Sequence, residues 1–150
     1  MKFRIENIPP HQIAFIRNVG PYGIGNLATM EKLKVWAKSN DLLNAESILY
    51  GIAHDNPEQT RPEDCRYDTC IALETKIPKD NTIQLSIIAG GRYAIFPLSH
   101  TAEAVQHAWQ EVFPLLVKLK YHMDATRPVL ERYKAQLVMN HQCEICVPIL

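Results

Sequence analysis

The sequence has few features of a membrane protein, a nucleic-acid-binding protein or a disulfide framework. Lys and Arg total 16, as do Asp and Glu, so the formal net charge is zero. Because phosphate contacts dominate duplex affinity, a chain without a basic excess is not expected to bind DNA directly. No apolar run approaches the roughly 20 residues of a membrane helix, and residues 1–10 (MKFRIENIPP) lack an apolar signal core. We expect a cytoplasmic protein with neither a nucleic-acid nor a membrane partner.

Cysteine is scarce, and its spacing excludes the common metal and redox motifs. The four are Cys65, Cys70, Cys143 and Cys146. Cys143 and Cys146 lie in a run expected to be a strand, where residues three apart point to opposite faces and cannot share one ion. The Cys65–Cys70 spacing is not of the zinc type, and the six histidines are scattered. We expect buried, reduced thiols, with no metal, no cofactor and no assigned catalytic residue.

The composition and pattern predict one α+β domain over residues 1–150. Apolar residues make up 47% and charged residues 21%, as in globular proteins. The first half is expected to contain strands over 2–8, 12–19, 47–54 and 66–77, a helix over 27–37 and a capped helical turn over 60–63. The second half is expected to contain strands over 82–89, 92–98, 128–138 and 143–149, and a helix over 101–121 that Pro114 kinks or splits.

The two halves, about 1–77 and 82–150, are related as an internal repeat. Residues 13–16 (IAFI) match 93–96 (YAIF) at an offset of eighty, and residues 67–72 match 143–148 at an offset of seventy-six. Each half therefore reads strand, strand, helix, strand, strand. Two such units related by a pseudo-twofold axis leave a cleft between them, where ligand sites are favoured.

Glu131 stands out as an acid on an apolar strand face. Alternation places it with Val129 and Tyr133 on a face of which it is the only charged member, while the other face is largely polar. Gly51 matches Glu131 at the offset of eighty, so one half offers an acid and the other offers space. A buried carboxylate is costly unless it meets a cation or several donors. Two interpretations stay open: a carboxylate in an aromatic pocket for an organic cation, or a structural glutamate satisfied by an Arg, a Lys or a tyrosine hydroxyl.

Aromatic residues on the expected strands and helices could form the walls of such a pocket, because ring faces attract cations. The candidate ligand-binding residues are Glu131, Tyr133, Trp36, Tyr50, Tyr93, Phe96 and Trp109. Trp36 and Trp109 are expected at matching places on the two helices, although tryptophans on amphipathic helices also serve as core. Tyr93 and Phe96 face opposite ways on an ideal strand, so both can line the pocket only if a bulge intervenes.

Five motifs, in this order and spacing, resemble the GyrI-like family, the effector-binding domain of some bacterial transcription activators and of stand-alone DNA gyrase inhibitors. They are residues 18–22 (NVGPY), 50–57 (YGIAHDNP), 60–68 (TRPEDCRYD), 90–94 (GGRYA) and 128–133 (PVLERY). The resemblance implies two tandem strand-helix-strand-strand units in pseudo-twofold arrangement, forming an antiparallel sheet of about eight strands with two main helices. It also implies that Glu131 contacts cationic ligands, as the corresponding glutamate does in drug-sensing members.

The leading functional hypothesis is a non-catalytic, multidrug-type binding module for amphipathic, cationic organic molecules. A DNA-binding region of its own is not expected, since the first expected strand follows Met1 closely. One alternative is a hydrolase of reactive electrophilic small molecules, in which Glu131 is the general base and Tyr133 or Tyr93 the orienting donor. Another is a protein inhibitor of DNA gyrase. The resemblance thus allows a protein partner, either a regulator or gyrase, and the sequence leaves the oligomeric state undetermined.

Overall fold

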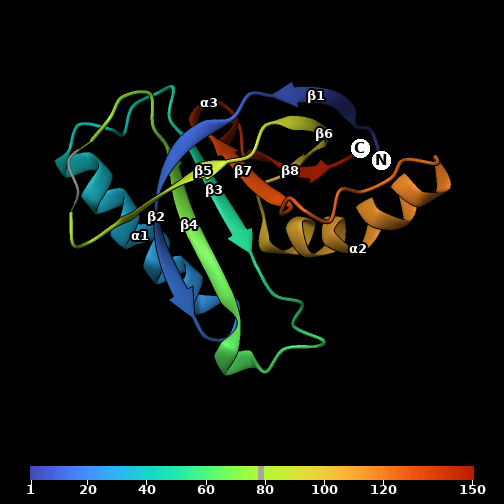
Figure 1. Cartoon of the computed structure of the whole chain (residues 1–150), viewed down its shortest axis with the longest axis horizontal. Helices are drawn as coiled ribbons and strands as arrows, with labels where there is room; N and C mark the ends of the chain where they lie inside the picture. The colour runs from blue at the N-terminus through green and yellow to red at the C-terminus, as the bar shows by residue number, and fades with distance from the viewer. Residues whose placement is uncertain (78–79) are drawn as a thin grey trace.

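The structure, a computed structural model, describes residues 1–77 and 80–150 as one curled antiparallel sheet with two main helices (Figure 1). The strands are β1 (Arg4–Ile8), β2 (His11–Val19), β3 (Ile48–Ala53), β4 (Arg66–Ala72), β5 (Gln84–Ile88), β6 (Gly91–Ser99), β7 (Leu130–Lys134) and β8 (Gln142–Pro148). The helices are α1 (Ile24–Ser39), α2 (Ala102–Lys118), the short α3 (Ala135–Val138) and the 3₁₀ turn η1 (Pro62–Asp64). The predicted α+β class is confirmed.

The strand order shows the predicted pseudo-twofold arrangement. The sheet runs β1-β6-β8-β7-β3-β4-β2-β5, so β3 and β7 pair at the centre and each half continues outward in the same sequence of elements. Ile13 pairs with Ala72 and Tyr93 pairs with Pro148, which are the same positions under the offsets of eighty and seventy-six. Gly51 pairs directly with Glu131. The pseudo-twofold axis therefore passes through the Gly51–Glu131 pair.

Both main helices pack on the same face of the sheet, α1 over β2 and β4 and α2 over β6, and Figure 1 shows them on opposite sides of the central strands. The other face holds a separate core built from strand residues such as Phe15, Tyr50 and Leu130. The sheet must curl around this core, because Arg132 on β7 donates to Glu6 on β1 at 2.9 Å across two intervening strands. A flat sheet would hold β1 and β7 roughly 14 Å apart.

Two strands end earlier than the sequence pattern predicts. β4 ends at Ala72, not at residue 77, because Ala72 forms the last pair with β2. β7 ends at Lys134 and the chain turns into α3, because Lys134 pairs with Ile48, the first residue of β3. One backbone hydrogen bond follows each last pair, from the Leu73 N–H to the Gln12 carbonyl and from the Ala135 N–H to the Ser47 carbonyl. The alternation in the sequence continues beyond the point where the strand pairing ends.

The helix boundaries follow local chemistry, with two corrections. Thr101 caps α2 by accepting a hydrogen bond from the Ala104 N–H at 3.1 Å. Pro114 does not split α2, because it lies on the exposed side of the helix, where water can satisfy the released carbonyl group. The predicted turn over 60–63 exists as η1, but Arg61 precedes it and no side chain caps it. Within residues 1–77 and 80–150, no helix combines the length and apolar character needed to cross a membrane.

The four cysteines are buried free thiols, as predicted. Cys146 belongs to the core on the face that lacks helices, whereas Cys143 lies near Glu131 on the opposite face. This confirms that the two side chains point away from each other. Burial raises the pKa of Cys143 to about 12, so its thiol is protonated at neutral pH.

Candidate functional site

Glu131 lies at the centre of the sheet, where the two halves of the chain meet. On β7, Glu131 pairs with Gly51 of β3 on one side and with Ile145 of β8 on the other. The side chain points to the helix-covered face, where Trp109 of α2 contacts it, and only 8% of the residue is exposed. The strand pairing thus places a carboxylate on the pseudo-twofold axis, away from bulk water.

Neutral groups satisfy this carboxylate. The Tyr67 hydroxyl donates to Oε1 at 2.5 Å, and the Trp109 indole N–H donates to Oε2 at 3.2 Å. Among residues 1–77 and 80–150, no Lys, Arg or His forms an ion pair with Glu131. Burial raises the pKa of Glu131 above its ordinary value, and hydrogen bonds from Tyr67, Trp109 and Tyr133 oppose that rise only in part. Both interpretations made from the sequence keep support, since a tyrosine hydroxyl does bond to the acid but no cation does.

Glu144 shows what a buried glutamate with a structural partner looks like in the same sheet. Only 2% of it is exposed, and it accepts hydrogen bonds from Arg132 at 2.9 Å and from Arg4 at 2.7 Å. Burial alone would raise the pKa of Glu144, but these two guanidinium groups hold it below its ordinary value. Glu131 has the burial without the cations, and this difference marks it as the unusual acid.

Aromatic side chains from both halves contact Glu131 or the rings next to it. We call Tyr22, Tyr67, Trp109, Phe113 and Tyr133 the aromatic cluster. Tyr22 meets Tyr67 edge to face with ring centroids 6.0 Å apart, and Trp109 lies 5.9 Å from Phe113. Tyr22 is fixed by its hydroxyl, which donates to the Arg66 carbonyl at 2.9 Å. Tyr67 and Trp109 thus bond to the acid directly, and Tyr22 and Phe113 extend the aromatic surface by one contact each.

The glycine opposite Glu131 provides room for Tyr67. A Cβ atom added at Gly51 would overlap the Tyr67 hydroxyl and lie 2.8 Å from Glu131 Oε1. The space predicted at Gly51 is therefore occupied by the tyrosine that bonds to the acid.

We expect Gly51→Ala to destabilise the fold by about 1–3 kcal/mol, because the new methyl group overpacks this position. In a Tyr67→Phe background, which lacks the nearest atom, part of that cost should disappear. Urea unfolding of the four proteins of this double-mutant cycle measures the coupling. An equal cost in both backgrounds would show that the tyrosine hydroxyl is not what Gly51 accommodates.

Several residues proposed from the sequence lie elsewhere. Tyr50 and Tyr93 belong to the core on the face without helices, because each neighbours a residue that faces the helices. Phe96 shares the face of Glu131 two strands away, but it is fully buried and stacks on Phe3 at 4.9 Å. The structure brings Tyr133 and Trp109, but not these three residues, to Glu131.

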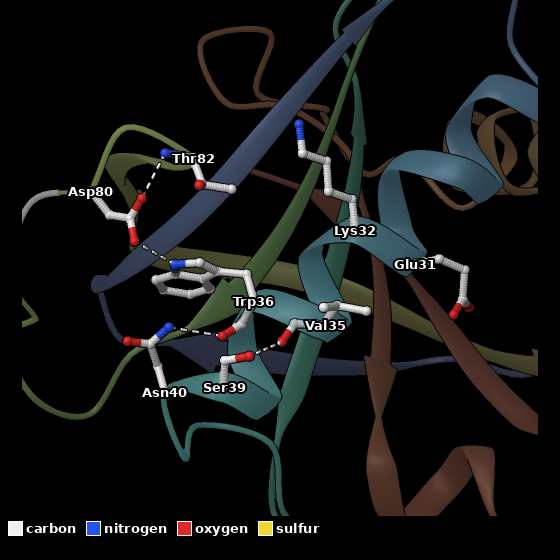
Figure 2. A pocket seen from close by; sticks show the side chains of 8 residues that line it. All are labelled: Glu31, Lys32, Val35, Trp36, Ser39, Asn40, Asp80 and Thr82. Atoms are coloured by element: carbon white, nitrogen blue, oxygen red, sulfur yellow. Dashed lines mark hydrogen bonds between the residues drawn. The ribbon is translucent and has the colours of Figure 1, made fainter.

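Trp36 is also separate from Glu131. It lies three residues before the end of α1, whereas Trp109 lies in the first half of α2, so the two tryptophans do not occupy matching places. Trp36 lines an open groove of about 550 Å³, and its indole N–H donates to Asp80 at 3.1 Å. Figure 2 shows this hydrogen bond and the other side chains of the groove. Trp36 is only 8% exposed and belongs to the core between α1 and the sheet, which agrees with the core alternative for this residue.

Tyr67 and Tyr22 were not among the site residues proposed from the sequence. Both lie within motifs that carry the family resemblance, and alternation on β4 was sufficient to place Tyr67 with Thr69 on one face. Thr69 pairs with Gly51, so Tyr67 must share the face of Glu131.

The chain belongs to the GyrI-like family: a match to the GyrI-like small molecule binding domain covers residues 1–150. It is 40% identical over 150 residues to the SPbeta prophage-derived protein YosT of Bacillus subtilis strain 168, named as a candidate transcriptional regulator, with 99% of each chain covered. It is 27% identical over 136 residues to a DNA gyrase inhibitor of Citrobacter koseri, covering 89% of this chain and 86% of that one. The domain is therefore a small-molecule binding domain, and the resemblance inferred from the motifs is confirmed.

Solved structures share the fold at low sequence identity. The C-terminal domain of EcmrR superposes with a TM-score of 0.77 at 13% identity, covering 99% of this chain and 97% of that one. SAV2435, solved with bound tetraphenylphosphonium, superposes with a TM-score of 0.60 at 14% identity, covering 100% of this chain and 94% of that one. These likenesses confirm the architecture.

Proposed function

We propose that the domain binds lipophilic organic cations, with the positive charge on Glu131 and the apolar groups against the aromatic cluster. The observation that carries the proposal is a buried carboxylate whose described partners are neutral donors, Tyr67 and Trp109. A bound cation would supply the missing countercharge in a site where water screens little. The solved complex of SAV2435 with tetraphenylphosphonium supports this ligand class, because that protein shares the fold.

The aromatic cluster suits a ligand whose charge is spread over a bulky apolar body. Ring faces attract cations by about 0.5–2 kcal/mol each, and several rings lie around one acid here. Since only 8% of Glu131 is exposed, a bulky ligand reaches it after side chains at the rim, such as Trp109 and Tyr22, change rotamer. The hydrogen bond from Tyr67 to Oε1 keeps the carboxylate in place when Trp109 moves and releases Oε2.

We expect tetraphenylphosphonium to raise the melting temperature by about 5–10 °C at a hundredfold excess over its Kd. Tetraphenylborate, which has the same shape and the opposite charge, should give no comparable increase. Differential scanning fluorimetry with both ions makes the comparison. An equal or larger shift with the anion would contradict a cation site at Glu131.

A protein partner is the second part of the proposal. Relatives named as a DNA gyrase inhibitor and as a candidate transcriptional regulator support a role in which the domain acts on another protein. Hydrolysis remains the competing proposal, because the Tyr67–Glu131 pair could also orient a nucleophile. Mass spectrometry of ligands recovered after incubation separates the two, since a binder returns its ligand unchanged.

A further inference from the structure

Besides the groove next to Trp36, a cavity lies on the sheet face that carries no helix, on the other side of the sheet from the Glu131 carboxylate. Its volume is about 300 Å³, at the lower end of the range for small-molecule pockets. Residues of β2, β3, β4, β5, β6 and β7 line it, so both halves of the chain contribute. The aromatic cluster contributes no residue to its lining.

The walls of this cavity are apolar. Ile13 and Phe15 of β2, Ile52 of β3 and Leu130 of β7 all line it, and all four belong to the core of this face. Apolar walls of this kind favour a hydrocarbon body, because the ligand exchanges water contact for packing against buried side chains.

One end of the cavity is polar, and its acid is already paired with an arginine and a histidine. Asp68 accepts two hydrogen bonds from Arg17, at 2.7 and 2.9 Å, and its Oδ2 lies 2.7 Å from His54 Nε2. Burial alone would raise the pKa of Asp68, but the hydrogen bonds from Arg17 and His54 hold it below its ordinary value. An ionised carboxylate only accepts, so His54 carries its proton on Nε2. Arg17 and His54 together bond to both oxygens of Asp68, so the charge of this acid is already compensated within the chain.

Arg17 keeps a free donor at this end. Its Nε and Nη2 atoms bind Asp68, while Nη1 has no hydrogen-bond partner in the part of the chain that the structure describes. The guanidinium also lies 5.7 Å from the Phe15 ring centroid, which holds it beside the apolar wall. The neighbouring charges, Asp55 and Arg66, are bonded to each other and cancel. The polar end therefore presents a donor without net negative charge.

We propose that this cavity binds a small apolar carboxylic acid as its carboxylate, with the carboxylate on Arg17 Nη1 and the hydrocarbon body against Phe15, Ile52 and Leu130. A planar guanidinium already fixed by Asp68 is suited to accept a second carboxylate without losing further side-chain freedom. The ligand class has the opposite charge to that proposed for Glu131, and the two sites are independent.

Isothermal titration with 4-isopropylbenzoate tests this proposal, with 4-isopropylbenzamide as the uncharged probe of the same shape. We expect the carboxylate to bind at least tenfold more tightly than the amide, and to do so equally well with tetraphenylphosphonium present. Tighter binding of the amide, or no binding of the carboxylate at about 10 mM, would overturn the proposal.

Two variants locate the binding. Ser86→Trp places a large side chain in the lining from the exposed strand β5, and should weaken carboxylate binding at least tenfold. Leu85→Trp, on the same strand but outside the lining, is the matched control and should bind like wild type. Arg17→Gln should abolish the preference for carboxylate over amide. Undiminished binding by a folded Ser86→Trp protein would place the ligand elsewhere and refute the proposal.

Discussion

Replacing Glu131 with Gln is expected to lower the affinity for tetraphenylphosphonium about ten- to a hundredfold, the range for loss of a charge-assisted contact. The free energy of unfolding should stay unchanged or rise, because the substitution removes a buried charge without a countercharge. The amide fits the existing hydrogen bonds: its oxygen can accept from Trp109, and its N–H can donate to the Tyr67 hydroxyl.

The pKa of Glu131 gives this variant a pH signature. Because the folded-state pKa is raised, the folded protein binds this proton more tightly than the unfolded chain does. Its contribution to stability is therefore fully present below the unfolded value of 4.5, and it is lost as the pH rises through the raised folded value. The Gln variant should lack that loss, so its advantage in unfolding free energy should grow over this interval.

Glu111→Gln is the matched control for the affinity measurement. Glu111 lies on α2 close to Trp109, its side chain is 46% exposed, and the substitution removes the same charge. Its affinity for tetraphenylphosphonium should stay near that of wild type, since an exposed charge is screened by water and salt. Equal losses in the two variants would show that general electrostatics, and not contact with Glu131, determine the binding.

Arg132→Met is expected to give the largest loss of stability, about 3–5 kcal/mol in urea unfolding at neutral pH. Arg132 is 3% exposed and donates to Glu144 at 2.9 Å and to Glu6 at 2.9 and 3.2 Å. Without it, Glu144 remains buried and keeps the half-exposed Arg4 at 2.7 Å and the more distant Lys134 at 3.9 Å. Methionine keeps much of the side-chain volume, so the loss reports the charge and not a cavity.

A second substitution tests whether the buried charge of Glu144 causes this loss of stability. Adding Glu144→Leu to Arg132→Met should recover most of the loss, because the buried charge that lost its buried partner is then absent. Arg61→Met, at an exposed arginine paired with Asp64, should cost less than about 0.5 kcal/mol. A double variant as unstable as Arg132→Met would mean that packing, and not charge, explains the effect.

The repeat could be predicted from the sequence because it depends on local pattern and fixed offsets. The offset of eighty placed Gly51 against Glu131, and the strand pairing has the same register. The burial of the sheet face without helices could not be predicted in this way. Alternation put Arg132 on a largely polar face, yet that face is buried, because the curl of the sheet brings Glu6 of β1 to it. Curl depends on pairing across the whole chain and leaves no local signal.

The surroundings of Glu131 were only partly predictable for a related reason. Tyr133 and Trp109 were proposed and do contact or neighbour the acid, whereas Tyr67, sixty-four residues away in sequence, reaches it across Gly51. Tyr50 was misplaced even though its neighbour Gly51 was correctly matched to Glu131. Adjacent residues on a strand point to opposite faces, so that match already implied that Tyr50 faces away.

The position of Glu131 on the pseudo-twofold axis constrains how such a site can arise. Two identical copies of one half would place the same residue on both sides of the axis, giving either two glycines or two like charges within contact distance. Two adjacent carboxylates in a buried setting would share one proton and lose the full negative charge. A single carboxylate facing a glycine requires halves of different sequence, which a covalently joined pair can maintain. A site on the axis occurs once per chain, so the proposed function predicts one bound cation per chain. Asp68 and Glu144 lie off the axis and match at the offset of seventy-six, so at that position both halves carry an acid.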